Sequence, residues 1–203
     1  MPDWDEDSPE LRDNLRRVIH QIRNDAESRA PLNLDTLRIW HRETMKGLKP
    51  PNRAWVGRLR GEAGLEQVQV QVGKFPGVSA SEVADETKAF ERRLSRIIQR
   101  LDEAIATEAD LNADQLDSVL QVCAWTHAEW VRIHPFANGN GRTARLLANA
   151  IALRYGLPPF VCLRPRPNHG YPNAAEAAMR GDFKPLALAF RRMLDACLSD
   201  EIR

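Results

Sequence analysis

Apolar residues recur every three to four positions along most of the chain, and glycine, proline and asparagine interrupt them. This spacing places apolar side chains on one face of a helix. The first stretch covers residues 11–22, with Ser8 as its expected cap, and the second begins near Asn33, with Asn33 or Asp35 as its expected cap. The other expected helices run from Ser79 or Ser81 to residue 105, over residues 116–133 and 146–153, and on both sides of Gly181. The pattern predicts a mostly α-helical bundle.

One segment departs from helical spacing. Residues 67–72 alternate glutamine and valine strictly, which is typical of a half-buried β-strand, and residues 58–60 are its expected hairpin partner. A lone hairpin in a helical protein has an unpaired edge, which can accept an extended segment of another protein. We therefore expect a target-docking flap, with a hairpin that merely packs on a helix as the alternative. The valines of this predicted flap are Val68, Val70 and Val72.

Composition limits the classes of function. The 203 residues are 43% hydrophobic and 28% charged, as in one soluble domain with a substantial core. The net charge of +1 gives no sign of a nucleic-acid partner or an acidic membrane surface. There is no apolar run long enough for a signal peptide or a membrane span. Three widely spaced cysteines suggest neither a zinc site nor a disulfide framework, and Cys123 is expected in the core. These features favour a cytoplasmic protein.

Residues that can bind an anion or exchange a proton are most concentrated in residues 134–145, His-Pro-Phe-Ala-Asn-Gly-Asn-Gly-Arg-Thr-Ala-Arg. Its glycines and asparagines favour a loop between two helices. A loop that presents backbone N–H groups at a helix N-terminus binds anions, and Arg142 and Arg145, three residues apart, suit phosphate oxygens. Within this segment, His134 is the side chain that exchanges a proton near neutral pH. The combination predicts phosphoryl or nucleotidyl transfer to a hydroxyl.

Each of these features alone is weak, because a Gly-x-Gly is often a turn and a lone histidine is usually structural. Together they resemble the Fic-domain motif His-x-Phe-x-Asp/Glu-Gly-Asn-Gly-Arg-x-x-Arg, with Asn138 as the one departure. The resemblance covers roughly residues 34–198 and is strong at the motif. It implies an all-α Fic fold with a small β-hairpin flap over the active site. It also implies, in most members, transfer of AMP from ATP to a hydroxyl of a target protein.

The resemblance assigns roles to individual residues. His134 is the implied base that activates a serine, threonine or tyrosine of the target, and Phe136 anchors the loop in the core. A tyrosine after the motif lies against the nucleotide base in the family, which makes Tyr171 the expected adenine contact. Arg145 is the expected partner of the γ-phosphate. The implied phosphate-binding residues are Gly139, Asn140, Gly141, Arg142 and Arg145.

Asn138 stands where the family usually has an acidic residue that holds Mg²⁺ between the α- and β-phosphates. A carboxylate is a charged oxygen ligand for Mg²⁺, whereas an amide offers only a neutral carbonyl oxygen. Because the ion also takes ligands from phosphates and water, we expect an active enzyme with a weak metal site. The alternative is a member whose transfer activity is lost or changed.

The sequence also suggests an organisation and a mode of control. We expect an N-terminal helical extension at residues 1–33 and a Fic domain at residues 34–203. Many Fic proteins are restrained by a helix carrying Ser/Thr-x-x-x-Glu-Gly/Asn, but no glutamate here is followed by glycine or asparagine. Either a separate antitoxin-like protein supplies the inhibitory residue, or the enzyme is not restrained in this way. Three functions remain open: AMP transfer, a nucleotide-binding regulatory module, or transfer of UMP, phosphate or phosphocholine.

Overall fold

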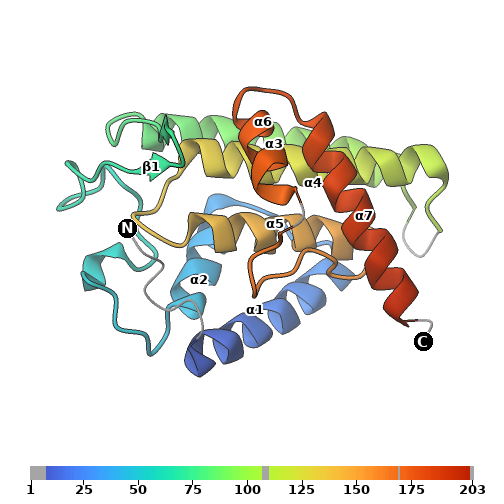
Figure 1. The fold of residues 1–203 in the computed structure, drawn as a ribbon, viewed down its shortest axis with the longest axis horizontal. Coiled ribbons are helices and arrows are strands. Elements are labelled where there is room, and N and C mark those ends of the chain that lie inside the picture. Colours follow the sequence, from blue (N-terminus) through green and yellow to red (C-terminus); the bar gives the residue numbers. More distant parts are fainter. Residues whose placement is uncertain (1–7, 107–109, 169, 202–203) are drawn as a thin grey trace.

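Helix α5 (Asn140–Arg154) forms the centre of a helical bundle, and nearly all of its residues are buried (Figure 1). The computed structural model describes residues 8–106, 110–168 and 170–201. These ranges contain seven α-helices, one short 3₁₀ helix and two strands. The other helices are α1 (Pro9–Glu27), α2 (Leu34–Thr44), α3 (Val83–Ala104), α4 (Ala113–Ile133), α6 (Tyr171–Met179) and α7 (Lys184–Glu201), with the 3₁₀ helix at Arg53–Trp55. The predicted mostly helical fold is confirmed.

Polar side chains set the starts of several helices. The Ser8 hydroxyl accepts a hydrogen bond from the Leu11 N–H at 3.3 Å, and Oδ1 of the Asn33 side chain accepts one from the Thr36 N–H at 2.9 Å. These two predicted caps are confirmed. Neither Ser79 nor Ser81 caps α3, because that helix begins at residue 83 and the Ser79 hydroxyl donates instead to the Glu82 carboxylate.

The helices pack in an order that holds the turn between α4 and α5 in place. Helices α4 and α5 lie side by side, α1 and α2 pack on α5, and α3, α6 and α7 pack on α4 (Figure 1). Helix α1 contributes four fully buried apolar side chains to the same core as α5. The division of the chain at residue 33 stays a prediction, although α1 and α5 share one core.

The β-structure is a short hairpin beside the end of α4 (Figure 1). Strand β1 (Gln71–Val72) pairs antiparallel with β2 (Phe75–Pro76), and Val72 lies opposite Phe75. The predicted pairing with residues 58–60 is therefore wrong. Gly73, at φ +60°, lets the chain reverse within two residues, so the nearer segment becomes the partner. The N–H of Arg60 instead donates to the Pro135 carbonyl at 2.8 Å.

The side chains of residues 67–72 alternate between half-buried and exposed, although only residues 71–72 are paired as a strand. The three valines of the predicted flap are half-buried and the three glutamines are exposed. Regular pairing is short because Pro76 in β2 has no N–H to donate. One further bond, from the Gly77 N–H to the Val70 carbonyl at 3.1 Å, continues the contact beyond the strands.

The described part of the chain contains no helix that is both long and apolar enough to cross a membrane. All three cysteines lie in this part, and none forms a disulfide. Cys123 is fully buried, and its thiol donates to the Ala148 carbonyl of α5 at 3.4 Å. Its predicted place in the core is confirmed.

Candidate active site

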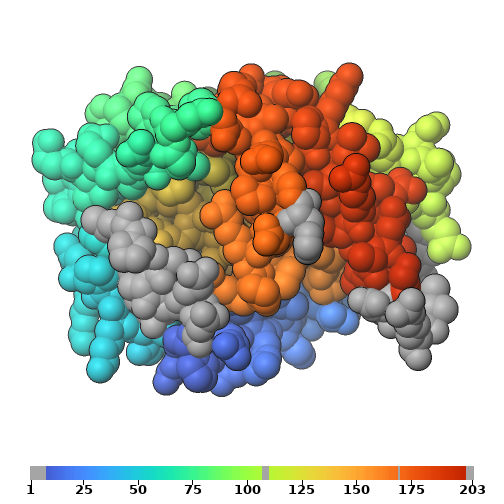
Figure 2. Space-filling model, in the orientation of Figure 1, coloured from blue at the N-terminus to red at the C-terminus, as the bar shows by residue number. Residues whose placement is uncertain are grey.

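A cavity of about 570 Å³ lies between the α4–α5 turn, the hairpin and α6. In Figure 2 the gold surface of the turn and the start of α5 is set back between the green hairpin segment and the orange α6 segment. Val68 and Val70 do not line this cavity. The predicted site residues that do line it are Val72, His134, Asn138, Gly139, Asn140, Gly141, Arg142, Arg145 and Tyr171.

His134 ends α4 in the left-handed region, at φ +52° and ψ +56°. This conformation is uncommon for a side chain larger than glycine and turns the imidazole away from the helical path. Its Nδ1 lies 3.1 Å from the Val131 carbonyl, which can only accept, so Nδ1 carries the proton. Burial lowers the pKa of His134 to about 4, the Val131 contact raises it and the nearby Arg60 lowers it. At neutral pH the ring is therefore uncharged, with a lone pair on Nε2.

The loop after His134 is held by the side chain of Asn140. Its Oδ1 accepts the Phe136 N–H at 2.9 Å, and its Nδ2 donates to the Phe136 carbonyl at 2.8 Å. The side chain of Asn140 is thus committed to the shape of the loop. The first intrahelical bond of α5 runs from the Thr143 N–H to the Gly139 carbonyl at 3.0 Å. The preceding N–H groups of Asn140 and Gly141 have no partner within the helix, which creates an anion-binding position at the cavity.

His41 of α2 contacts this loop and was not among the predicted site residues. Its Nδ1 accepts the Gly57 N–H at 2.9 Å, so its Nε2 carries the proton and donates to the Asn138 carbonyl at 2.9 Å. Its ring stacks on the fully buried Phe136 with centroids 3.9 Å apart. Gly139, at φ +82°, lies against it, and a Cβ there would come within 3.0 Å of His41 Nε2. The loop is therefore clamped between α2 and α5.

Two buried guanidiniums flank the start of α5. Arg142 is 2% exposed and Arg145 is 4% exposed. Nη1 of Arg145 lies 3.5 Å from the position that a Cβ of Gly141 would occupy, so its guanidinium covers the first turn of the helix. Its Nη2 donates to the Leu163 carbonyl at 3.3 Å, and its Nε is buried without a hydrogen-bond partner.

Arg145 forms no ion pair with a carboxylate in the described residues, so its charge is not neutralised by the protein there. Burial lowers its pKa most, Tyr171 raises it, and the neighbouring Arg164 and Arg166 lower it. Positive charge concentrated in one wall attracts an anion. The electrostatics of the cavity therefore suit a ligand with several negative charges.

The described side chains around Asn138 form no metal site by themselves, and its role as a weak Mg²⁺ ligand stays a prediction. Its Oδ1 accepts the Gly139 N–H at 2.6 Å, and its Nδ2 is buried without a hydrogen-bond partner. Among the described residues that line the cavity, the acidic one is Glu176, which pairs with Lys74 at 2.6 Å and Arg180 at 2.9 Å. The described residues contain no cluster of three acidic, histidine or cysteine side chains suited to a metal. The residues present therefore do not fit Mg²⁺ without ligands from phosphate and water.

Tyr171 begins α6 and is 2% exposed at the cavity wall. Its hydroxyl lies 2.6 Å from Nε2 of His127. Phe190 stacks on its ring with centroids 6.5 Å apart, and the Arg166 guanidinium lies over the ring at 6.0 Å. The predicted contact of Tyr171 with adenine stays a prediction, because the geometry gives its hydroxyl a protein partner and leaves the base unplaced.

The hairpin forms one wall of the cavity through residues 71–75. Lys74 at its tip bonds to Glu176 of α6, so an ion pair links the two sides of the opening. Both partners are well exposed, and pairs of this kind contribute little to stability. The Arg180 guanidinium of α6 also lies over the Phe75 ring of the hairpin, at 5.8 Å. The role of the hairpin in docking a target stays a prediction.

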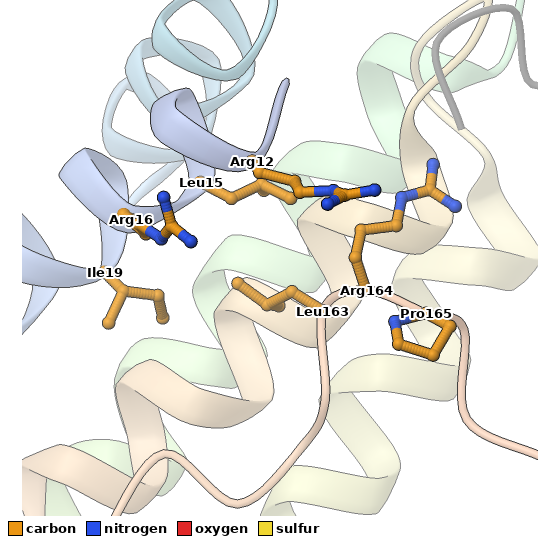
Figure 3. A pocket seen from close by; sticks show the side chains of 7 residues that line it. All are labelled: Arg12, Leu15, Arg16, Ile19, Leu163, Arg164 and Pro165. Atoms are coloured by element: carbon orange, nitrogen blue, oxygen red, sulfur yellow. The ribbon is translucent and has the colours of Figure 1, made fainter. Parts of the chain in front are cut away.

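A second cavity, of about 480 Å³, lies between α1 and residues 163–165 (Figure 3). Arg12, Arg16 and Arg164 line it together with aliphatic side chains. The described residues that line it include no side chain that can take up a proton at neutral pH, so they offer no base for catalysis. Arg164 lines both this cavity and the first one.

The burial of His41 gives stability a measurable pH dependence. Burial lowers its pKa from 6.5 to about 4, so the unfolded chain binds a proton between these values that the folded chain does not. The free energy of unfolding should therefore fall as the pH drops through this window. Between pH 7 and pH 5 we expect His41→Gln to lose about 2 kcal/mol less than the wild type.

Urea unfolding at the two pH values measures this difference. His20 is exposed, so His20→Gln is the matched control and should lose as much as the wild type. Equal losses in all three proteins would contradict a buried, neutral His41.

Several residues at the site carry no local sequence signal. His41 contacts a loop 97 residues away, His127 contacts Tyr171 over 44 residues, and Arg60 bonds to a carbonyl 74 residues away. Arg164 and Arg166 line the cavity from a proline-rich loop whose basic character was visible in the sequence. A lone histidine or arginine in a helical pattern does not reveal such distant partners.

The comparison with known proteins agrees with this arrangement. A model of the Fic/DOC family matches residues 31–152. The chain is 32% identical over 154 residues to protein adenylyltransferase fic-1 of Caenorhabditis elegans, a match covering 76% of this chain and 25% of that protein. It is 43% identical over 84 residues to protein adenylyltransferase Fic of Nematostella vectensis, covering 39% of this chain and 19% of that protein. The matched part is thus a quarter or less of these relatives.

Solved structures share the fold. A fragment of Fic-1 from Caenorhabditis elegans, residues 134–508 by its description, aligns with a TM-score of 0.66 and 23% identity, covering 95% of this chain and 49% of that one. BepC from Bartonella tribocorum, solved with bound AMPPNP, aligns with a TM-score of 0.59 and 17% identity, covering 92% and 87%. At these identities the likeness concerns the arrangement of the helices.

Proposed function

The chain belongs to the Fic/DOC family, and on that basis we propose that it is a protein adenylyltransferase. It moves AMP from ATP to a serine, threonine or tyrosine hydroxyl of a target protein. The observation that carries this proposal is the pairing of a neutral imidazole with an anion-binding helix start. His134 keeps its Nε2 lone pair while Asn140, Gly141 and the buried Arg145 supply donors in the same cavity. Relatives named protein adenylyltransferase support the choice of AMP.

The chain's own residues suffice to describe the transfer. The triphosphate lies against the N–H groups of Asn140 and Gly141 and beside the guanidiniums of Arg142 and Arg145. Nε2 of His134 takes the proton from the target hydroxyl, whose oxygen bonds to the α-phosphorus. The bond from that phosphorus to the oxygen bridging to the β-phosphate breaks, and pyrophosphate leaves with the electron pair. Arg145 stabilises the charge that gathers on the leaving group.

The target protein docks on the hairpin in this proposal. Strand β1, Gln71–Val72, gives an extended target segment a short edge to bond with. Main-chain hydrogen bonds at such an edge would position the target hydroxyl without reading the side chains around it, so they select little for the target's sequence. A separate antitoxin-like inhibitor, which would make the chain part of a toxin–antitoxin pair, and the cytoplasmic location stay predictions.

The donor can be identified by where its label ends up. The purified chain is incubated with cell lysate and ATP labelled on either the α- or the γ-phosphate, and with UTP labelled on the α-phosphate. Transfer of the α-label from ATP alone supports AMP transfer. Transfer of the γ-label indicates phosphate transfer, and label from UTP indicates UMP transfer. If no donor, including labelled CDP-choline, modifies any protein, the proposed enzyme is wrong and the regulatory module remains.

Asn138 makes the metal requirement testable. We expect Asn138→Asp to reach half-maximal transfer at a Mg²⁺ concentration about tenfold lower than the wild type, because a carboxylate binds this ion better than an amide. Transfer rates measured over a Mg²⁺ titration give both values. Asn138→Ala is the control, since it removes the oxygen without adding charge and should not gain affinity for Mg²⁺. Identical titration curves for Asn138→Asp and the wild type would show that residue 138 does not face the ion.

A further inference from the structure

His41 of α2 holds the peptide bond that joins Asn138 to Gly139. Its side chain is 2% exposed and does not line the first cavity. Its Nδ1 lies 2.9 Å from the Gly57 nitrogen, whose N–H can only donate, so Nδ1 is the unprotonated nitrogen of the ring. The proton of the neutral ring is therefore on Nε2, which donates to the Asn138 carbonyl at 2.9 Å. A contact outside the loop thus sets which nitrogen donates to the loop.

The direction of this carbonyl decides where the next N–H points. The peptide bond between Asn138 and Gly139 is trans, so its C=O and N–H point to opposite sides. Because the carbonyl is turned to His41, the Gly139 N–H points away from α2. Oδ1 of Asn138 lies 2.6 Å from that nitrogen, and both of these residues line the cavity, whereas His41 does not. An oxygen atom can therefore reach the Gly139 N–H from the side of the cavity.

The packing around His41 opposes reversal of this peptide. Its ring stacks on Phe136, with centroids 3.9 Å apart and planes at 28°. A Cβ on Gly139 would come within 2.7 Å of Cε of Met45 and 3.0 Å of Nε2 of His41, so the backbone lies directly against both side chains. A reversed peptide would place the Gly139 N–H against the Nε2–H of His41, and the Asn138 carbonyl oxygen would face the cavity, where it repels anions. Only the observed orientation presents a donor to the cavity.

We propose that His41 is a positioning residue: it keeps the Asn138–Gly139 peptide turned so that the Gly139 N–H faces the phosphates of the donor nucleotide. This N–H then joins those of Asn140 and Gly141 as a third backbone donor, and successive N–H groups that face one point bind an anion together. The inference rests on the proposed function, because it needs a ligand that carries phosphate. A phosphate oxygen carries more negative charge than the amide oxygen of Asn138, so it forms the stronger bond and displaces Oδ1 from the Gly139 N–H.

Two amide substitutions separate the roles of the two ring nitrogens. In His41→Asn, Oδ1 lies near the position of Nδ1, so the variant keeps the acceptor for Gly57 but has no donor that reaches the Asn138 carbonyl. In His41→Gln, the side chain is one carbon longer, and its NH₂ group lies near the position of Nε2. That variant keeps the donor to Asn138 and loses the bond to Gly57. Each variant therefore removes one hydrogen bond, and only His41→Asn frees the peptide.

Asn14 of α1 provides a control that loosens α2 without touching the loop. It is 2% exposed, and its Nδ2 donates to the Thr44 carbonyl at 3.0 Å and to the Lys46 carbonyl at 2.7 Å. Asn14→Leu therefore removes two hydrogen bonds from the end of the helix that carries His41. If His41 acted only by stabilising α2, Asn14→Leu would affect the loop as His41→Asn does.

The probe is inorganic triphosphate, added to the ¹⁵N-labelled full chain while the backbone amide signals are followed by NMR. In the wild type we expect the Gly139 signal to shift together with that of Gly141. In His41→Asn the dissociation constant should rise about tenfold and the Gly139 shift should be lost, while the Gly141 signal still responds. His41→Gln should stay within about threefold of the wild type, and Asn14→Leu within about twofold. An unchanged dissociation constant in His41→Asn, or an equal loss in Asn14→Leu, overturns the proposal.

Measurements on the wild type alone decide the proposal if His41→Asn does not fold. The ¹⁵N signals of the His41 ring should place its proton on Nε2. A proton on Nδ1, or a Gly139 amide that does not respond to triphosphate, overturns the proposal. If the Gly139 amide responds as expected but no group is transferred from ATP, the proposed function fails and the role of His41 stands. If AMP is transferred but the Gly139 amide does not respond, the role of His41 fails and the proposed function stands.

Discussion

Replacing His134 by alanine should lower the rate of AMP transfer by about 10²- to 10⁴-fold, the usual contribution of a general base. The reason is the state of its ring. Nδ1 donates to the Val131 carbonyl, so Nε2 keeps its lone pair, and the pKa near 4 leaves the ring neutral at pH 7. Among the described residues that line the cavity, no other side chain combines a free lone pair with this position, because the Nε2 of His127 is taken by Tyr171. The rate is measured as label transferred from ATP to the target.

His134→Asn separates chemistry from folding. Asparagine tolerates the left-handed conformation of residue 134, at φ +52°, and is a far weaker base than imidazole. Both variants should therefore lose transfer, while His134→Asn keeps the wild-type dissociation constant for ATP. His20→Ala, at an exposed position, should transfer at the wild-type rate. Transfer by His134→Asn within about tenfold of the wild type would assign the base to another group.

The helices were predictable because their signals are local. Apolar spacing located the seven helices, and Ser8 and Asn33 mark two of their starts. The hairpin partner was predicted wrongly for a physical reason. Alternation over residues 67–72 shows which side chains face inward, but it does not say which segment pairs with them. The positive φ of Gly73 decides that, by bringing residue 75 opposite residue 72.

The candidate site divides in the same way. Residues 134–145 could be identified as the candidate site from the sequence because one short segment carries the proposed base, the backbone donors and the guanidiniums. The roles of the surrounding shell could not be assigned. His41 of α2 fixes the loop, and Tyr171 of α6 forms a hydrogen bond with His127 of α4, and each contact exists only when distant helices pack. The side chain of Asn140 bonds to Phe136, so its expected contact with phosphate, which stays a prediction, is left to its backbone N–H.

Among these residues, Arg60 makes the most hydrogen bonds to distant parts of the chain. It is 1% exposed, and its guanidinium donates to four backbone carbonyls. Two belong to the end of α4, Ile133 at 3.0 Å and His134 at 2.7 Å. The other two flank the hairpin, Val68 at 3.2 Å and Val78 at 2.7 Å. One side chain therefore ties the proposed flap to the backbone of the proposed base. Its positive charge also suits the C-terminus of a helix.

Replacing Arg60 by methionine should lower the free energy of unfolding by about 3–5 kcal/mol, since four buried carbonyls lose their donor at once. Methionine keeps much of the volume of the stem, so the loss reflects the hydrogen bonds rather than a cavity. The stability of Arg60→Lys should fall between those of the wild type and Arg60→Met, because one ammonium cannot reach the carbonyls of α4 and those beside the hairpin at once. Urea unfolding at pH 7 gives the three values.

Arg58→Met is the matched control two residues away. The hydrogen bond of Arg58 to the Ala63 carbonyl is exposed, and its ion pair with Glu62 is long, at 3.4 Å, so its removal should cost less than about 1 kcal/mol. In conditions where Arg60→Lys stays folded, its transfer rate should drop while its dissociation constant for ATP stays near the wild-type value. That split is expected because Arg60 bonds to the hairpin and to the backbone of His134 but does not line the cavity. An Arg60→Met protein as stable as Arg58→Met would show that the hairpin and α4 hold together without this guanidinium.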